Sequence, residues 1–130
     1  MFYVESRLDE TAKSKVGAIG IAQIMPGTEQ EIRQSEPMIG DVKHARHGIK
    51  AGAYYMNKKI QTWRGRNRGY KCLYELSWAS YNAGTRNIIN AQGHSRNNKC
   101  WSGISPYLVK VTGDHAVETI GYVNLSLIHI

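Results

Sequence analysis

The sequence predicts an all-α protein, and three observations support this. Apolar residues recur at intervals of three and four, which is the period of one helix face. No segment alternates apolar and polar residues over a useful length, as a half-buried strand would. Helix start signals stand between the periodic segments, as in Pro26-Gly27 and Ser105-Pro106. With 130 residues, 42% of them hydrophobic, we expect a single domain over 1–130 with a modest core.

The N-terminal elements are expected to be short. Glu5 ends a first helix, because the run SKVGAIG that follows cannot continue one comfortably. One small hairpin is possible around residues 16–24. A second helix starts where Thr28 and Glu31 have the spacing of a capping box, and it ends before Pro37.

The strongest helical pattern follows, with Asp41 as its expected N-cap. It ends at a glycine-rich basic loop, RGRNRG. Residues at helical spacing predict one apolar stripe made of Val42, Ala45, Ile49, Ala53, Met56, Ile60 and Trp63. Because Trp63 lies on this stripe, a core role suits it at least as well as stacking on a sugar.

The C-terminal half predicts further helices. One runs from Cys72 to Ala83 and ends at Gly84. A short helix over 85–91 and a polar loop, QGHSRNNK, come next. Another helix has Ser105 as N-cap with Pro106 after it, and Gly113 closes it. Asp114 then caps a last helix, whose predicted apolar residues are Val117, Ile120, Gly121 and Val123.

The charge is strongly basic and unevenly placed. The formal net charge is +7 and the pI is about 9.5. No acid occurs between Asp41 and Glu75, whereas nine cations do: Lys43, Arg46, Lys50, Lys58, Lys59, Arg64, Arg66, Arg68 and Lys71. Such a stretch attracts polyanions, which include nucleic acid, anionic lipid and bacterial wall polymers, or it forms a solvated face. No apolar run is long enough for a membrane span, and the start lacks the features of a secretory signal.

The cysteines and histidines leave little room for a metal. Cys72 and Cys100 could form a disulfide worth roughly 3 kcal/mol, or they could be free buried thiols. Two thiols alone do not make a metal site. His44 and His47 stand three residues apart, but no third ligand is apparent. We therefore expect neither a metal nor a cofactor.

Glu5 is the candidate for chemistry. It lies in the stretch ESRLDETAKSKVGAIGIAQIMPGT with apolar neighbours on both sides. Apolar surroundings raise the pKa of a carboxyl, and a carboxyl that stays protonated near neutral pH can act as a general acid toward a glycosidic oxygen. From its position alone, an exposed glutamate on a helix face is the simpler interpretation.

Three motifs in order change that balance. The first is Glu5-Ser6 with Gly17-Ala18-Ile19-Gly20, Gln23 and Met25-Pro26-Gly27-Thr28; the second is ASYNAG, and the third is ETIGYV. Together they resemble the signatures of the soluble lytic transglycosylases, the goose-lysozyme-like branch of the lysozyme superfamily. The segment HGIKAGAYYMNKKI resembles the helix that this family places between the first two. The resemblance implies a single compact helical lysozyme-like domain with a substrate cleft.

The resemblance also implies residue roles. Glu5 would be the single catalytic acid and then base, giving a 1,6-anhydro-muramic product without consuming water, so that one carboxyl suffices where ordinary glycosidases use two. Ser6 and Gln23 would position the sugar. Tyr81 and Asn82 would line the cleft, and two residues of the third motif would face them: Glu118 and Tyr122. Each of these four has an alternative role in core packing or structural hydrogen bonding, and for Glu118 and Tyr122 that alternative fits as well as substrate contact.

The resemblance implies peptidoglycan glycan strands as substrate and action at the bacterial cell wall. We expect a monomer of the phage-endolysin type, held to anionic wall polymers by its basic face, without nucleic acid or stable membrane insertion as partners. One departure is Ile21-Ala22, where the family has a bulky pair. The alternatives are a goose-type muramidase and a non-catalytic binder of wall or nucleic acid. The muramidase needs a second carboxylate, with four candidates: Asp9, Glu10, Glu36 and Asp41.

Overall fold

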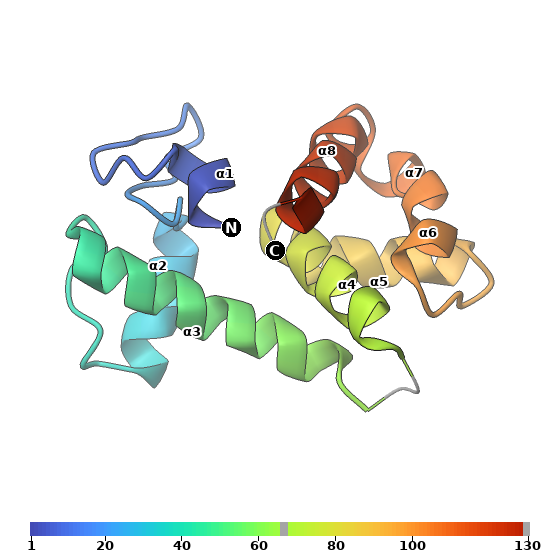
Figure 1. Ribbon diagram of the computed structural model, residues 1–130, viewed down its shortest axis with the longest axis horizontal. Coiled ribbons are helices and arrows are strands. Elements are labelled where there is room, and N and C mark those ends of the chain that lie inside the picture. The colour runs from blue at the N-terminus through green and yellow to red at the C-terminus, as the bar shows by residue number, and fades with distance from the viewer. Residues whose placement is uncertain (66–67, 129–130) are drawn as a thin grey trace. The chain divides into compact units, whose positions relative to one another are not determined.

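The computed structural model describes residues 1–65 and 68–128, and within these residues the chain is all-α, as predicted. It divides into two compact units, Met1–Tyr55 and Met56–Ile130. Unit 1 holds α1 (Phe2–Ser6), α2 (Pro26–Ser35) and the start of α3 (Ala45–Trp63) (Figure 1). Unit 2 holds the rest of α3 with α4 (Tyr70–Ala83), α5 (Thr85–His94), α6 (Trp101–Ile104), η1 (Ser105–Tyr107), α7 (Val109–Thr112) and α8 (His115–Ile128). That 1–130 acts as one catalytic domain stays a prediction, and Arg66 of the basic stretch lies outside the described residues.

The start of α2 differs from the prediction. The helix begins at Pro26, with Met25 as an extended N-cap that makes no side-chain capping bond. Proline suits the first helical position because its fixed φ matches the helix and its missing N–H would be unpaired there. The expected capping box of Thr28 and Glu31 is therefore wrong, since both residues already lie inside the helix. The predicted end before Pro37 is confirmed.

The segment before α2 is a compact turn. Two isolated antiparallel bridges, Lys13–Ile19 and Ile19–Ile24, are present, and no strand forms among the described residues. Ser14 supports the turn, because its hydroxyl accepts a hydrogen bond from the Ala18 N–H at 2.9 Å. The possible hairpin thus reduces to single bridges between turns.

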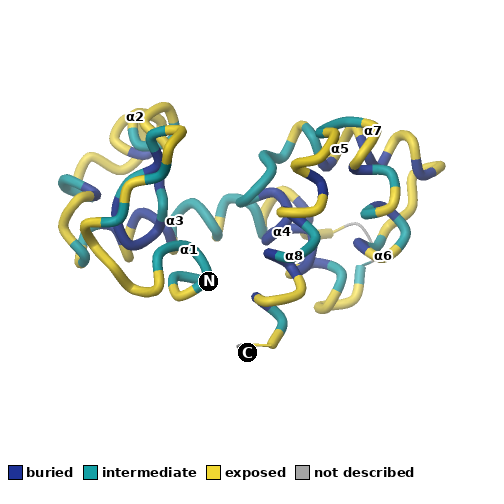
Figure 2. The backbone as a smooth tube through the Cα atoms, turned by 90° about the horizontal axis from the view of Figure 1, so that it is seen from above, coloured by how far each residue is buried: buried dark blue, intermediate teal, exposed yellow. Residues whose placement is uncertain are grey.

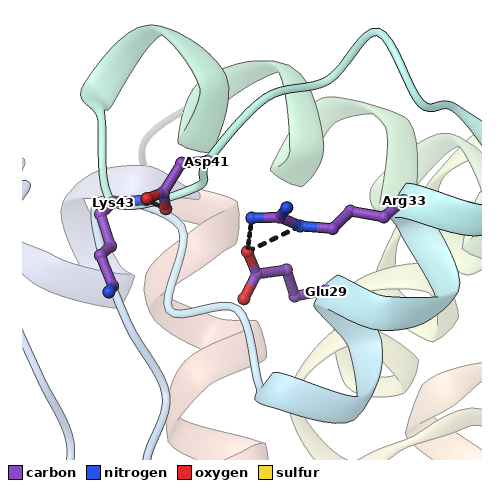
Figure 3. A network of polar contacts seen from close by, with 4 residues as sticks. All are labelled: Glu29, Arg33, Asp41 and Lys43. Carbon is purple, nitrogen blue, oxygen red and sulfur yellow. Dashed lines mark hydrogen bonds and ion pairs between the residues drawn. The ribbon is translucent and has the colours of Figure 1, made fainter.

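The start of α3 is also set differently from the prediction. Asp41 does not cap the helix; its carboxylate accepts a hydrogen bond from the Lys43 N–H at 3.0 Å and closes a turn (Figure 3). This bond holds the pKa of Asp41 below its ordinary value. The helix begins four residues after Asp41, where the Ala45 N–H donates to Glu10 Oε2 at 3.0 Å. A carboxylate distant in sequence therefore supplies the N-terminal acceptor.

One ion pair on α2, between Arg33 and Glu29, lies beside this turn. Arg33 donates to Glu29 Oε1 from both Nε and Nη2, at 3.1 and 2.7 Å. Figure 3 shows this pair one helical turn apart on α2, with Asp41 and Lys43 on the neighbouring segment. The pair raises the pKa of Arg33. Because the Arg33 side chain is 53% exposed, solvent screens the pair, and we assign it little stabilisation.

The buried face of α3 within unit 1 is not the predicted apolar stripe. Ile49 and Ala53 of that stripe are exposed, whereas Gly48, Ala51 and Gly52 are buried. The small residues are needed because neighbouring segments approach too closely for a side chain: a Cβ on Gly48 would lie 2.9 Å from a backbone oxygen. A pattern of large apolar residues does not reveal a buried helix face that is built from small residues.

Unit 2 is organised around α4, which packs against α5, α6 and α8 (Figure 1). Seven consecutive or near-consecutive residues of α4 are buried, from Leu73 to Ser80, so the helix is covered on most of its circumference. Figure 2 shows most of this stretch in the colour of buried residues. Trp63, the predicted core tryptophan, is 1% exposed and donates its indole N–H to Ser80 Oγ at 2.9 Å. The buried indole donor is thereby satisfied.

Helix ends in unit 2 confirm some predictions and correct others. Gly84 and Gly113 end α4 and α7 with φ of +83° and +58°, a backbone conformation that favours glycine. The helix predicted over 85–91 continues to His94, so the polar loop is shorter than expected. Ser105 does not cap a helix; it is the first residue of the 3₁₀ turn η1, which joins α6 to α7. The last helix begins at His115, directly after Asp114, as predicted.

Of the four apolar residues expected on α8, Val123 is buried as predicted, whereas Ile120 and Gly121 are only half-buried. Val117 is 75% exposed. The buried residues of this helix are Ala116, Thr119, Tyr122, Val123 and Ser126. The face is set by a polar residue, Thr119, whose hydroxyl has a partner on α4. A hydrogen-bonded threonine can lie in a core, which an apolar count does not anticipate.

The two cysteines, left open by the sequence, form the disulfide Cys72–Cys100. It joins the first turn of α4 to the residue before α6. Arg68 supports the same connection, because its Nε donates to the Lys99 carbonyl at 2.7 Å. Two independent links therefore hold these segments together.

Reduction of this disulfide should destabilise the protein by roughly 3 to 4 kcal/mol, because the oxidised bond closes a loop with a sequence separation of 28 residues and restricts the unfolded chain. Denaturant unfolding with and without reductant measures the difference. The double variant Cys72→Ser/Cys100→Ser is the control, and reductant should not affect it. Equal unfolding midpoints for oxidised and reduced wild type would contradict the prediction.

Glu75 should make stability depend on pH. Burial raises its pKa, against the opposing effect of Lys71, whose ammonium lies 4.0 Å away. The folded state then holds the proton more tightly, so stability falls as pH rises above the ordinary value of 4.5. The free energy of unfolding of Glu75→Gln should be higher than that of wild type by on the order of 1 kcal/mol at neutral pH. Near pH ~4 the difference should shrink; a difference independent of pH would contradict this.

Candidate active site

Glu5 lies on the one-turn helix α1, next to its end. The helix stops because Arg7 and Leu8 both adopt left-handed backbone conformations, with φ of +55° and +68°. The Arg7 N–H still donates to the Tyr3 carbonyl at 2.9 Å and closes the last turn. Glu5 is half-buried, and its Oε1 atom is inaccessible to solvent. The predicted helix end at Glu5 is confirmed to within one residue.

Close packing fixes the position of α1 on α3. A Cβ added to Gly52 would lie 2.6 Å from Phe2 Cε1 and 2.8 Å from Ala22 Cβ. The Phe2 ring and Ala22 therefore sit directly on the backbone of Gly52. Ala22 is 1% exposed and Ile21 is 6% exposed, so the pair that departs from the family pattern is buried inside unit 1.

Ser6 connects α1 to the glycine-rich turn. Its hydroxyl donates to the Ile21 carbonyl at 2.9 Å. This bond joins residues 15 positions apart in the sequence. Within unit 1 this bond therefore holds α1, which carries Glu5, against the turn. Ser6 has this structural role whether or not it also contacts a substrate.

The turn itself depends on Gly20. This residue has φ of +71°, and a Cβ on it would lie 2.6 Å from the Val42 carbonyl oxygen. Its N–H donates to the Ala12 carbonyl at 2.9 Å. A side chain would conflict with both the backbone conformation and the neighbouring segment at Val42, so glycine is required here.

Gln23 closes the same turn. Its Nε2 donates to the carbonyls of Ala12 and Gly20, at 3.2 and 3.0 Å. Gln23 itself has φ of +46°, an uncommon conformation for a residue with a side chain. Both amide hydrogens are directed into the turn, which leaves Oε1 as the atom suited to accept a hydrogen bond from a ligand. Ser6 and Gln23 thus belong to one hydrogen-bonded frame, and Glu5 lies beside Ser6 on α1.

Two of the four site residues predicted in unit 2, Asn82 and Glu118, come together where α4 ends against α8. Asn82 Oδ1 accepts a hydrogen bond from Thr119 Oγ1 at 2.7 Å, and Thr119 is 2% exposed. A cavity of about 370 Å³ lies at this point. Its lining residues are Asn82, Ala83, Asn87, Val111, Thr112, His115, Glu118 and Thr119. The volume suits a sugar-sized ligand.

The other predicted residues of unit 2 differ in exposure. The Glu118 side chain lines this cavity, is 72% exposed, and lies 3.9 Å from His115 Nδ1. Tyr81 is half-buried, next to Asn82 on α4. Tyr122 is 6% exposed and belongs to the buried face of α8, which favours a packing role.

Thr119 is a residue of this candidate site that the sequence interpretation missed. It stands in the motif ETIGYV, but a threonine next to a glutamate gives no separate signal of its own. The sequence signal that could have identified Thr119 is its position three residues after Ala116, which places both residues on the buried face of α8. Its hydroxyl fixes the side-chain amide of Asn82, so we regard it as a positioning residue.

The candidate second carboxylates are mostly committed to local structure. Asp9 accepts hydrogen bonds from the Thr11 hydroxyl and N–H, at 2.7 and 2.8 Å, and these lower its pKa. Glu10 caps α3, and Asp41 closes the turn before it. A carboxylate with a lowered pKa is a weaker base toward water. Glu36 is exposed just after α2.

No metal centre is assembled by the part of the chain that the structure describes: it contains no group of three or more histidine, cysteine, aspartate or glutamate side chains placed to share an ion. His44 and His47 contact each other edge to face, with ring centroids 6.0 Å apart. Among the described helices, none has both the length and the hydropathy that crossing a bilayer demands.

Comparison with known proteins gives one family. A family model described as the transglycosylase SLT domain matches residues 1–103. The matched range contains the first two motifs, whereas the third motif and α8 lie beyond it. No curated protein and no solved structure matches the chain.

Thr119→Val should lower the rate at which a peptidoglycan suspension clears by roughly tenfold, because Asn82 loses the bond that orients it. Thr119→Ser keeps the hydroxyl and should restore most of the rate. Thermal unfolding of both variants separates this effect from loss of fold. Equal rates for the valine and serine variants would contradict a positioning role.

Proposed function

The chain belongs to the transglycosylase SLT domain family, whose members act on peptidoglycan, and on that premise we propose which bond it cleaves and how. The bond is the β-1,4 link from N-acetylmuramic acid to N-acetylglucosamine, and the product carries a 1,6-anhydro-muramic end. The observation that carries the proposal is Glu5, a half-buried carboxyl on a helix held against the glycine-rich turn. We propose that both units form one catalytic domain over 1–130.

In the proposed reaction Glu5 first acts as a general acid. It donates its proton to the glycosidic oxygen, the bond from that oxygen to C1 of the muramic acid breaks, and the N-acetylglucosamine leaves as an alcohol. The positive charge that develops at C1 is stabilised by the substrate's own N-acetyl group. Burial of Oε1 supports this step, because desolvation favours the protonated carboxyl.

Glu5 then acts as the base. Its carboxylate takes the proton from the C6 hydroxyl of the same muramic acid, and O6 attacks C1 to close the anhydro ring. The carboxyl ends the cycle protonated, no water is consumed, and no second carboxylate is needed. The local bonds of Asp9, Glu10 and Asp41 make this route more favourable than a muramidase mechanism.

The remaining site residues would hold the sugar. Gln23 Oε1 would accept a hydrogen bond from the glycan, while Ser6 keeps α1 on the turn. Asn82 and Glu118 would contact the substrate from the cavity of unit 2, with Tyr81 beside them. Tyr122 would act mainly by packing, given its burial.

The charge supports the proposed setting. A net charge of +7 would hold a monomer to the anionic polymers of a bacterial wall, as suits a lysin of the phage-endolysin type. Described cations of the basic stretch are exposed in both units, for example Lys50 and Lys71. Neither a cofactor nor a metal enters the proposed chemistry.

Glu5→Gln should reduce product formation at least about 100-fold, because the amide can neither give nor take the proton. Mass spectrometry of fragments released from purified peptidoglycan measures this, and wild type should yield 1,6-anhydro-muramic ends. Glu31→Gln, which changes an exposed glutamate of α2 in the same way, should behave as wild type. Fragments with reducing ends would instead favour the muramidase, and an active Glu5→Gln would overturn the role of Glu5.

A further inference from the structure

A second cavity, of about 540 Å³, lies at the N-terminal end of α4. It is bounded by the end of α3, by Arg64, Gly65, Arg68 and Gly69 of the connection that follows, and by the first turns of α4. Its lining residues differ from those of the cavity at Asn82. Tyr70 and Asn82 are twelve residues apart on α4, which corresponds to about 18 Å along the helix. The two cavities therefore occupy opposite ends of one helix within unit 2.

We propose that this cavity is a second glycan-binding site, which takes an acidic sugar segment of peptidoglycan and retains the protein on its polymeric substrate. The inference rests on the proposed function only in taking the bacterial wall as the target. This cavity lies away from Asn82 and is lined by no residue of the three motifs. It would therefore bind the glycan without cleaving it.

Two tyrosines give the cavity its apolar surface. Tyr70 is 82% exposed and Tyr74 is 41% exposed. They are four residues apart on α4 and so share one helix face. A tyrosine ring offers a flat apolar face and a hydroxyl, at low conformational cost. Two such rings at a cavity mouth suit a sugar, whose ring also has a flat apolar face and hydroxyls at its edge.

Arginine supplies the preference for an acidic ligand. Arg64 is exposed at the cavity, and Arg68 lines it as well. A guanidinium binds a carboxylate through two parallel hydrogen bonds. Peptidoglycan carries carboxylates on its muramic acid substituents and peptides. The combination of aromatic rings with arginine therefore selects a carboxylate-bearing glycan over a neutral one.

The frame of the cavity is preformed. The Arg68 guanidinium lies over the Trp63 ring, 5.1 Å from its centroid, and also donates to the Lys99 carbonyl. The disulfide Cys72–Cys100 fixes the same turn of α4. These contacts already hold Arg68 and the first turn of α4 in place, so a ligand would bind to this side of the cavity without ordering it first.

The test compares two matched double variants. Arg64→Gln/Tyr70→Ala alters the cavity, while Arg86→Gln/Tyr107→Ala removes an exposed arginine and a tyrosine elsewhere in unit 2. Both lose one positive charge. Cosedimentation with insoluble peptidoglycan freed of phosphate-bearing polymers measures the protein concentration at half-saturation. We expect this value to rise at least about tenfold for the cavity variant, with the control near wild type.

Three further measurements make the outcome decisive. Turnover of a soluble muramic-acid tetrasaccharide should stay at the wild-type rate in the cavity variant. Thermal unfolding checks the fold, and Tyr70→Ala alone repeats the test if the midpoint of the double variant falls. A neutral N-acetylglucosamine tetrasaccharide should compete with peptidoglycan less well than the acidic one.

The proposal is overturned if both double variants lose binding equally, which would indicate net charge alone, or if neither loses it. It is also overturned if a single-stranded oligonucleotide displaces wild type more effectively than the acidic tetrasaccharide, which would indicate a nucleic-acid site. Failure of the proposed function is distinguishable, because a protein that releases no fragments still gives a cosedimentation curve.

Discussion

The close backbone approach at Gly20 is the constraint on which unit 1 depends. A side chain there would meet the Val42 carbonyl at 2.6 Å, in a conformation that a side chain disfavours. Around this point the chain makes the bonds that define the site: Gln23 to Ala12 and Gly20, and Ser6 to Ile21. Glu5 is placed through this turn rather than by its own helix, which has only five residues.

In unit 2 the comparable constraint is a side-chain hydrogen bond. Asn82 and Thr119 join α4 to α8 through one hydrogen bond at the edge of a cavity, and both come from family-like motifs. Motif residues are therefore of two kinds in this protein. Some can meet a substrate, as Glu118 can from its exposed position, and others hold those residues in place.

Much of the fold could be predicted because helix periods and glycine or proline stops act locally. The all-α class and the ends at Gly84 and Gly113 are of this kind. The errors arise where distant residues decide the outcome. Glu10 sets the start of α3 from 35 positions away, and glycines rather than large apolar residues form its buried face. Sequence patterns contain no direct signal for either contact.

For the site, the motifs name the candidate residues, and the structure adds how their side chains are held. The bonds of Ser6 and Gln23 run to backbone carbonyls, which no residue type reveals in advance. The cavity between Arg64 and Tyr74 carries no motif at all, so only the folded chain brings its residues together. The central claim is that one carboxyl, Glu5, closes the ring within the substrate. Digestion of peptidoglycan in heavy-oxygen water, followed by mass spectrometry of the fragments, tests it most directly: unlabelled muramic ends are predicted, and incorporation of the heavy oxygen at C1 would contradict the account.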